Sequence, residues 1–141
     1  MVGEVNIAVH VAAGKGLMNE WWKIESCTPG GAVLTGGYEL PAKYVLHTFG
    51  SGFRNQAMLE SCYSSCLDLV LEHNIRSVAF PCLGTGSGGY PCDNAAQVAL
   101  TTTRKWLKTH KDKVDMIMFC VFKHIDFEVY YKYLNVIFPV E

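Results

Sequence analysis

The stretch Ile75 to Pro91, IRSVAFPCLGTGSGGYP, decides the fold. Its residues Ser77 to Leu83 are apolar at both alternating positions, which predicts a strand in the middle of a sheet with helices on both faces. The run stops at glycines, and residues 93–110 then have helical spacing, with basic residues near the end of the segment. A strand, a glycine loop and a helix therefore follow one another here.

The alternation of strands and helices continues on both sides of this stretch. We expect short helices at Val5 to Ala13 and through Trp22, strands at Ala32 to Thr35 and Tyr44 to Phe49, and a long helix at Gln56 to His73. After the central helix we expect a strand at Met116 to Phe122 and a last helix at Phe127 to Ile137. Strands that alternate with helices imply right-handed crossovers, so the sequence predicts an α/β fold with a largely parallel sheet.

Length, composition and charge narrow the class of protein. The chain has 141 residues, half of them apolar, which is material for one core, and we expect a single domain over 1–141. A formal net charge of -1 lacks the basic footprint of nucleic-acid binding, so nucleic acid is not an expected partner. The apolar runs are shorter than the roughly 20 residues of a membrane span, so no membrane is expected either.

The cysteines and histidines do not form the patterns of a disulfide or metal protein. Six cysteines are present, but Cys62 and Cys66 lie one helical turn apart and no signal peptide precedes them, which favours reduced thiols and a cytoplasmic or nuclear location. There is no C-x-x-C pair, and the five histidines are scattered without ligand spacing. We expect neither a metal nor a cofactor.

The glycine loop is the strongest candidate for a binding site. It consists of Gly84, Thr85, Gly86, Ser87, Gly88, Gly89 and Tyr90. Its glycines let backbone N–H groups turn toward an anion, and the next helix adds its positive N-terminal end. No lysine follows in the order G-K-[ST], and the glycines do not open a helix directly, so neither a P-loop nor a Rossmann fingerprint is present. A phosphate or diphosphate site is one hypothesis, and a tight loop without a ligand is the other.

Several aromatic residues allow two interpretations each. Phe122, at the end of a predicted strand, can stack on a base or pack a ribose, or it can belong to the core. Tyr90 can cover the phosphates or pack beside Pro91. Trp21 and Trp22 cannot both face inward from one helix, so one of them is expected to be exposed.

The remaining polar residues point to no reaction. His47 alternates with core residues and is interpreted as a buried histidine with a partner, whereas His10 is ambiguous. No serine, histidine and acid assemble into a triad, and Cys82 and Cys92 are expected to pack rather than react. The catalytic residues, if any, stay unknown.

Four stretches carry a family resemblance. They are VNIAVHVAAG (Val5 to Gly14), TPGGAVLTGGYELPAKYVLHTFG (Thr28 to Gly50), the stretch Ile75 to Pro91, and MFCVF with the later pair Phe138 and Pro139. In this order they span nearly the whole chain and resemble macrodomains of the MacroD-like branch. The patterns L-P-A-K-Y-V-L-H and G-T-G-x-x-G-Y-P at this separation are specific.

The resemblance implies a fold and a ligand. It implies a three-layer α/β/α sandwich, shortened at the N-terminus, that binds ADP-ribose or ADP-ribosylated protein. Gly84 to Tyr90 would hold the diphosphate, and Phe122 would lie near the adenine or the distal ribose. Many members hydrolyse the ester between ADP-ribose and an aspartate or glutamate, or deacetylate O-acetyl-ADP-ribose, and no metal is expected in this branch.

The chain departs from the family pattern in the first ligand loop. It is expected to begin inside this loop, with Gly3 and Val5 in the glycine run and without the asparagine-rich segment. Asn6 stands at the aspartate position and cannot act as a carboxylate base. Glu4 is either a substitute carboxylate or a solvated acid. His10 matches the family's histidine, which is expected to orient the loop.

Three functional hypotheses follow from the sequence. The first is a binding module for ADP-ribose or ADP-ribosylated protein. The second is a hydrolase or deacetylase of the same ligand. The third is a structural remnant that acts as an interaction module through an exposed sheet edge, which also invites self-association.

Overall fold

The order of helices and strands agrees with the sequence prediction. The computed structural model describes residues 3–50 and 55–140. The elements are α1 (Glu4–Ala13), α2 (Lys15–Trp21), β1 (Ala32–Gly36), β2 (Tyr44–Thr48), α3 (Gln56–Glu72), β3 (Ser77–Pro81), α4 (Cys92–His110), the short 3-10 helix η1 (Lys111–Lys113), β4 (Met116–Cys120) and α5 (His124–Ile137). None of the helices in the described ranges is long and apolar enough to cross a membrane.

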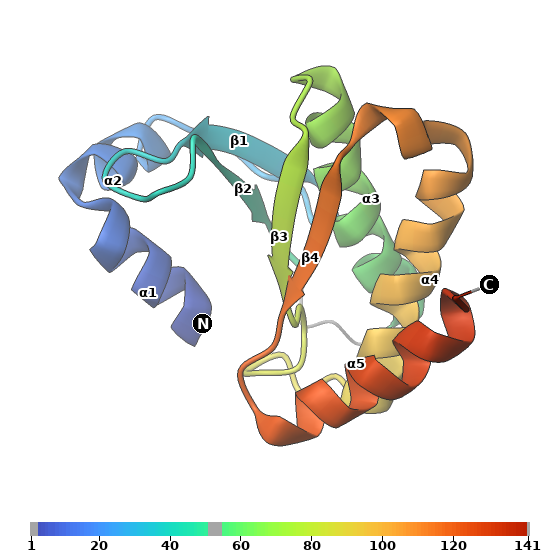
Figure 1. Ribbon diagram of the computed structural model, residues 1–141. Helices are drawn as coiled ribbons and strands as arrows, with labels where there is room; N and C mark the ends of the chain where they lie inside the picture. Colours follow the sequence, from blue (N-terminus) through green and yellow to red (C-terminus); the bar gives the residue numbers. More distant parts are fainter. Residues whose placement is uncertain (1–2, 51–54, 141) are drawn as a thin grey trace.

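The described strands form two separate pairs (Figure 1). β1 and β2 are antiparallel, with Val33 opposite His47. β3 and β4 are parallel, with Phe80 opposite Phe119. The long crossover through α4 gives β3 and β4 the connection that parallel strands require. The predicted α/β class is confirmed, and of the two described pairs β3 and β4 are the parallel one.

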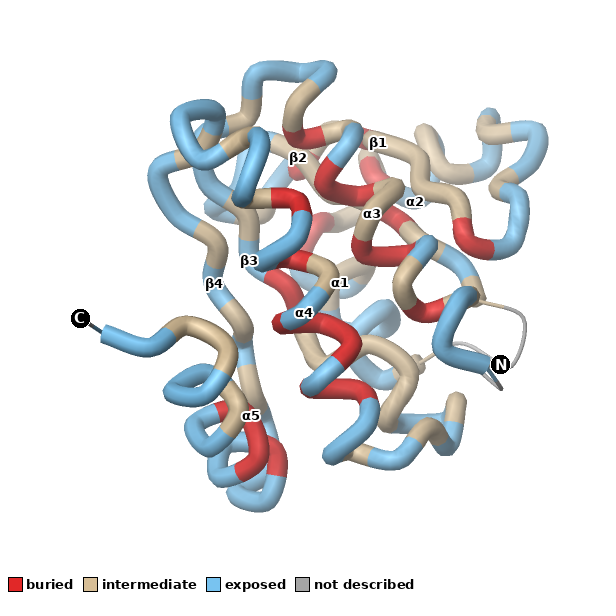
Figure 2. The backbone as a smooth tube through the Cα atoms, turned by 90° about the vertical axis from the view of Figure 1, so that its right-hand side faces the viewer, coloured by how far each residue is buried: buried red, intermediate tan, exposed pale blue. Residues whose placement is uncertain are grey.

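The main core lies between the β3–β4 pair and the helices α3, α4 and α5. These helices pack on one side of the pair, and the buried parts of α3 and α4 face each other in the interior (Figures 1 and 2). Buried residues recur at helical spacing, with Leu59, Tyr63 and Leu67 on α3 and Ala96 and Leu100 on α4. This stripe is the helical face that the sequence periodicity predicts.

The opposite face of β3 and β4 is open, contrary to the sequence expectation. Met116 is 54% exposed and Met118 is 48% exposed, and Ala79 on β3 is exposed as well. The helices α1 and α2 do not cover this face, because α2 is held against the β1–β2 hairpin. Glu20 accepts a hydrogen bond from the Tyr38 hydroxyl at 2.6 Å and another from the Gly36 N–H at 3.1 Å.

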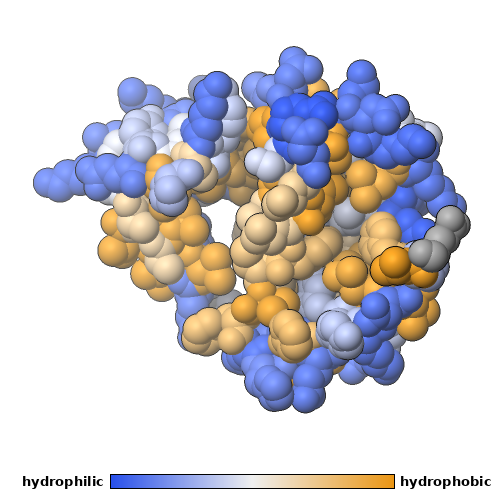
Figure 3. Space-filling model, viewed as in Figure 1, coloured by the Kyte–Doolittle hydropathy of each residue, from blue (hydrophilic) through white to orange (hydrophobic). Residues whose placement is uncertain are grey.

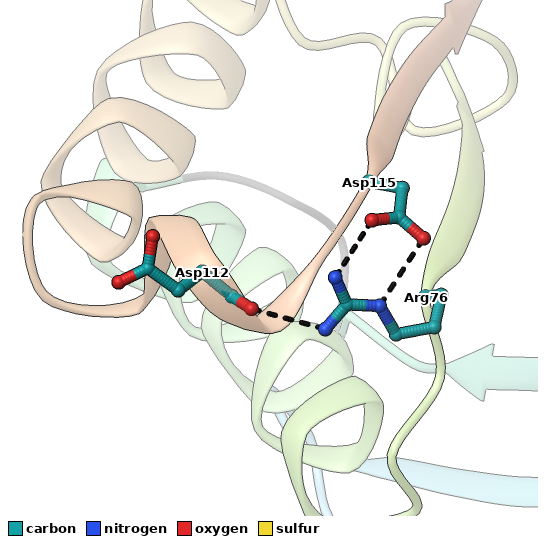
Figure 4. Close-up of polar contacts among 3 residues, drawn as sticks. All are labelled: Arg76, Asp112 and Asp115. Carbon is teal, nitrogen blue, oxygen red and sulfur yellow. Dashed lines mark hydrogen bonds and ion pairs between the residues drawn. The ribbon is translucent and has the colours of Figure 1, made fainter.

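An ion pair joins the beginnings of β3 and β4 (Figure 4). Arg76 donates to Asp115 through Nη2 at 2.6 Å and through Nε at 3.2 Å. It also donates to the carbonyl of Asp112 at 3.0 Å. Both side chains are more than half exposed, so the ion pair adds little to the free energy of unfolding. Its main effect is to hold the first residues of β3 and β4 together. The glycine loop follows the other end of β3.

Candidate functional site

The carboxyl ends of β3 and β4 bring two candidate segments together. The strands are parallel, and Pro81 at the end of β3 lies opposite Cys120 at the end of β4. The glycine loop follows the first strand and the segment with Phe122 follows the second, so both leave the sheet at the same edge (Figure 1). In open α/β sheets ligands bind at this edge.

Backbone hydrogen bonds close the glycine loop on itself. Tyr90 donates its N–H to the carbonyl of Gly84 at 2.9 Å, and Gly89 donates to Gly86 at 3.1 Å. Gly84 has φ +82° and Gly89 has φ +67°. Residues with a Cβ rarely adopt these backbone angles. At both ends of the loop, glycine is therefore a requirement of the backbone itself.

The middle of the loop offers unpaired donors. Among the described residues, no backbone carbonyl accepts from the N–H groups of 85–88. A Cβ added at Gly86 would meet no atom within 4 Å. Neither protein packing nor a left-handed φ therefore explains why residue 86 is a glycine, without a Cβ. Unpaired backbone N–H groups beside open space are what an anion needs.

Helix N-termini add positive potential at this end of the molecule. α4 begins at Cys92, directly after the loop, and runs for 19 residues. α5 begins at His124, just after Phe122, and α1 also starts toward this end (Figure 1). The partial positive charges of helix N-termini stabilise an anion bound between them.

The two predicted aromatic residues differ in exposure. Phe122 is 90% exposed, so the interpretation of this residue as part of the core is wrong. Its ring is free to stack on a ligand. Tyr90 is half-buried and packs against the core cluster, which agrees with its structural interpretation. That packing holds the ring of Tyr90 against the core.

The residues predicted for the first ligand loop lie at the start of α1. Gly3 is the N-cap of this helix, and its carbonyl accepts the N–H of Ile7 at 3.1 Å. Val5 and Asn6 lie in the first turn and are exposed, as is Glu4. No hydrogen bond among the described residues joins this turn to the glycine loop. The assignment of Gly3, Val5 and Asn6 to the site stays a prediction.

Half-buried His10 on α1 and buried His47 on β2 form a ring cluster with Trp21. The Nε2 atom of His47 lies 2.8 Å from Thr35 Oγ1, which confirms the prediction of a buried histidine with a partner. Burial, followed by the nearby His10, lowers the pKa of His47 to about 4. The rings of His10 and His47 lie 5.9 Å apart, and Trp21 lies 4.8 Å from His47. Trp22 is 77% exposed, so one of the two tryptophans faces outward as predicted.

The sequence reasoning missed a buried acid behind the glycine loop. Asp126, in the first turn of α5, is 6% exposed and accepts a hydrogen bond from the Cys92 thiol at 3.1 Å. A single aspartate among apolar residues gives no signal of burial in the sequence. The six cysteines are free. Burial raises the pKa of Cys82 to about 11, as expected of a thiol that packs rather than reacts.

The geometry of this end of the molecule defines a class of protein. A parallel strand pair, a closed glycine loop at its carboxyl end and a helix N-terminus behind the loop are typical of α/β proteins that hold an anionic ligand. Within residues 3–50 and 55–140 no group of three His, Cys, Asp or Glu side chains forms a metal site.

Comparisons with known proteins identify the family. The model of the macro domain family matches residues 1–99. A macro domain-containing protein of Chlorobaculum tepidum is 40% identical over 94% of this chain and 79% of its own length. The chain therefore belongs to the macro domain family.

Two further matches give the branch and a structure. The ADP-ribose glycohydrolase MACROD1 of Rattus norvegicus is 49% identical over 98% of this chain. The chain spans 56% of that relative, and 34% of the frog relative MACROD2. The crystal structure of the Trypanosoma brucei macrodomain in complex with ADP-ribose matches with a TM-score of 0.91 at 41% identity, over 94% of this chain and 57% of that one.

Proposed function

We propose that the chain binds ADP-ribose, free or attached to a protein, at the glycine loop. The observation that carries the proposal is the closed loop with unpaired N–H groups at 85–88, in front of the N-terminus of α4. These donors match the oxygens of a diphosphate. The ADP-ribose complex of the similar Trypanosoma brucei macrodomain supports this ligand.

The second strand end supports a ligand with a ring as well as phosphates. Phe122 is 90% exposed at the edge that the glycine loop shares. An exposed phenylalanine ring can stack on a base or pack a ribose. A nucleotide-like ligand that reaches from the loop to this ring uses both features.

Isothermal titration of the purified chain with ADP-ribose tests the proposal, with AMP as the control for adenine recognition alone. We expect a Kd of about 1–100 µM for ADP-ribose and much weaker binding of AMP. If a high excess of ADP-ribose gives neither heat nor thermal stabilisation, the chain does not bind the nucleotide. The third hypothesis, a structural remnant that acts as an interaction module, is then the better one.

A second candidate function is hydrolysis of the bound ligand. The MACROD1 and MACROD2 relatives are named as ADP-ribose glycohydrolases, which supports cleavage of ADP-ribose from acidic side chains or deacetylation of O-acetyl-ADP-ribose. Asn6 weakens this candidate, because an amide does not accept a proton as a carboxylate does. Its exposure at the start of α1 leaves the position accessible to a ligand.

We also propose that a second copy of the chain pairs with the outer edge of β4. Within the described strands, β4 pairs only with β3. An apolar groove beside it is lined by Ile117, Met118, Phe119, Phe127, Tyr130, Tyr131, Leu134 and Asn135. Figure 3 shows apolar residues gathered over this side of the molecule.

Analytical ultracentrifugation tests the pairing of two copies. We expect a dimer that the substitution Met118→Lys dissociates. A monomer at all concentrations would contradict the proposal.

A further inference from the structure

Asp126 is a buried carboxylate placed directly behind the two ligand-facing segments. It is 6% exposed, in the first turn of α5, and the preceding residues include Phe122. A buried carboxylate is costly unless it is paired or hydrogen-bonded. Its position therefore requires an explanation beyond helix formation.

The hydrogen bond to Cys92 joins Asp126 to the exit of the glycine loop. Cys92 is the first residue of α4, two residues after Tyr90, and its thiol donates to Asp126 Oδ1 at 3.1 Å. This bond raises the pKa of the Cys92 thiol, so the thiol keeps its proton and remains a donor at neutral pH. One side-chain contact thus connects the loop after β3 with the segment after β4.

The entrance of the loop lies close to the same carboxylate. Cys82 precedes the loop. The pKa of the Cys82 thiol is raised first by burial and second by the negative charge of Asp126. At this entrance the N–H of Leu83 donates to the hydroxyl of buried Tyr63 at 3.4 Å. The loop is thus anchored on α3 at one end and on α5 at the other.

We propose that Asp126 is a positioning residue that fixes the exit of the glycine loop relative to the segment carrying Phe122. The proposal rests on the proposed binding of ADP-ribose, whose diphosphate and ring then meet two surfaces held at a constant separation. When a site is already ordered in the free protein, binding of the ligand costs less conformational entropy, and the affinity is higher. Asp126 contributes to affinity in this way without touching the ligand.

The cysteine offers a matched pair of variants. Cys92→Ser keeps a hydroxyl donor for the carboxylate, whereas Cys92→Ala removes the donor. Asp126→Ala removes the acceptor. Tyr133→Phe is the control, because the Tyr133 hydroxyl donates to Asp93 at 2.7 Å and so forms another α4–α5 bond, from a residue about two helical turns after Asp126.

Hydrogen exchange of the ligand-free protein is measured first. We expect Cys92→Ala and Asp126→Ala to speed exchange about five-fold or more in residues 83–91 and 121–125 together, while Cys92→Ser and Tyr133→Phe leave both segments unchanged. A purely structural role would instead loosen α4 and α5 along their length, and equally in the alanine and serine variants. Unchanged exchange in both segments of the folded Cys92→Ala protein overturns the proposal.

Titration with ADP-ribose then separates the inference from the proposed function. We expect Cys92→Ala to bind about ten-fold more weakly than the unmodified chain, and Cys92→Ser to restore the affinity. If the unmodified chain does not bind, the proposed function fails and the exchange data still decide whether Asp126 links the two segments. If Asp126→Ala does not fold, the Cys92 pair decides alone. Equal affinity of the alanine and serine variants overturns the positioning role.

Discussion

Tyr90 donates its backbone N–H to the carbonyl of Gly84 at 2.9 Å, so the first and last residues of the glycine loop are joined directly. This bond turns the backbone between them into a closed ring at the end of β3. Because Gly84 needs a left-handed φ and Gly86 does not, the two glycines have separable roles. Gly84 shapes the loop, and Gly86 leaves space above it.

Gly86→Glu is expected to abolish ADP-ribose binding and to leave the fold intact. The φ of Gly86 is not left-handed, and a Cβ there meets no atom within 4 Å, so the fold accepts a side chain. A carboxylate about 4 Å from a diphosphate costs several kcal/mol at the protein surface, which predicts at least about a 100-fold loss of affinity. Titration measures the affinity, and a melting curve within about 2 °C of the unmodified chain verifies the fold. Unchanged affinity would remove the loop from the site.

Phe122→Ala is expected to weaken binding without a change in stability. The side chain is 90% exposed, so its loss opens no cavity, and the free energy of unfolding should change by less than about 0.5 kcal/mol. Stacking of an aromatic ring on a base contributes about 1–3 kcal/mol, which predicts a rise in Kd of about 5-fold to 150-fold. Phe122→Trp keeps a ring and should retain the affinity. Equal Kd values for the alanine and tryptophan variants would show that the ring does not contact the ligand.

Asn6→Asp is expected to raise hydrolysis of an ADP-ribosylated peptide and to change the Kd by less than about three-fold. A positioned carboxylate base contributes about 10²–10⁴-fold to such a step, and the amide of Asn6 supplies none of it. Glu4→Gln is the matched control and should leave turnover unchanged, because Glu4 is an exposed acid in the same turn. Release of ADP-ribose is followed by mass spectrometry. Loss of turnover in Glu4→Gln would instead identify Glu4 as the base.

The sequence predicted the elements better than their surroundings. The periodicity in α3 and α4 and the apolar runs in β3 and β4 give the order of elements, because local spacing determines which face a helix or strand buries. The open face with Met116 and Met118 was not predictable, since an apolar strand reads the same whether one face or both are covered. The position of the glycine loop follows from the topology, but the burial of Asp126 depends on contacts between distant helices.

The free energy of unfolding is expected to fall by about 1–3 kcal/mol between pH 6.5 and pH 4, and His47 should account for this fall. Burial and His10 lower the pKa of His47 from 6.5 in the unfolded chain to about 4 in the folded chain. In this window the unfolded state binds a proton at His47 that the folded state does not. Proton binding therefore favours unfolding as the pH falls from 6.5 toward 4, and the folded state keeps its full stability above pH 6.5. Urea unfolding at several pH values measures the slope. His47→Gln should flatten the slope, whereas a variant of exposed His124 should keep it, and an unchanged slope in His47→Gln would assign the pH dependence to other groups.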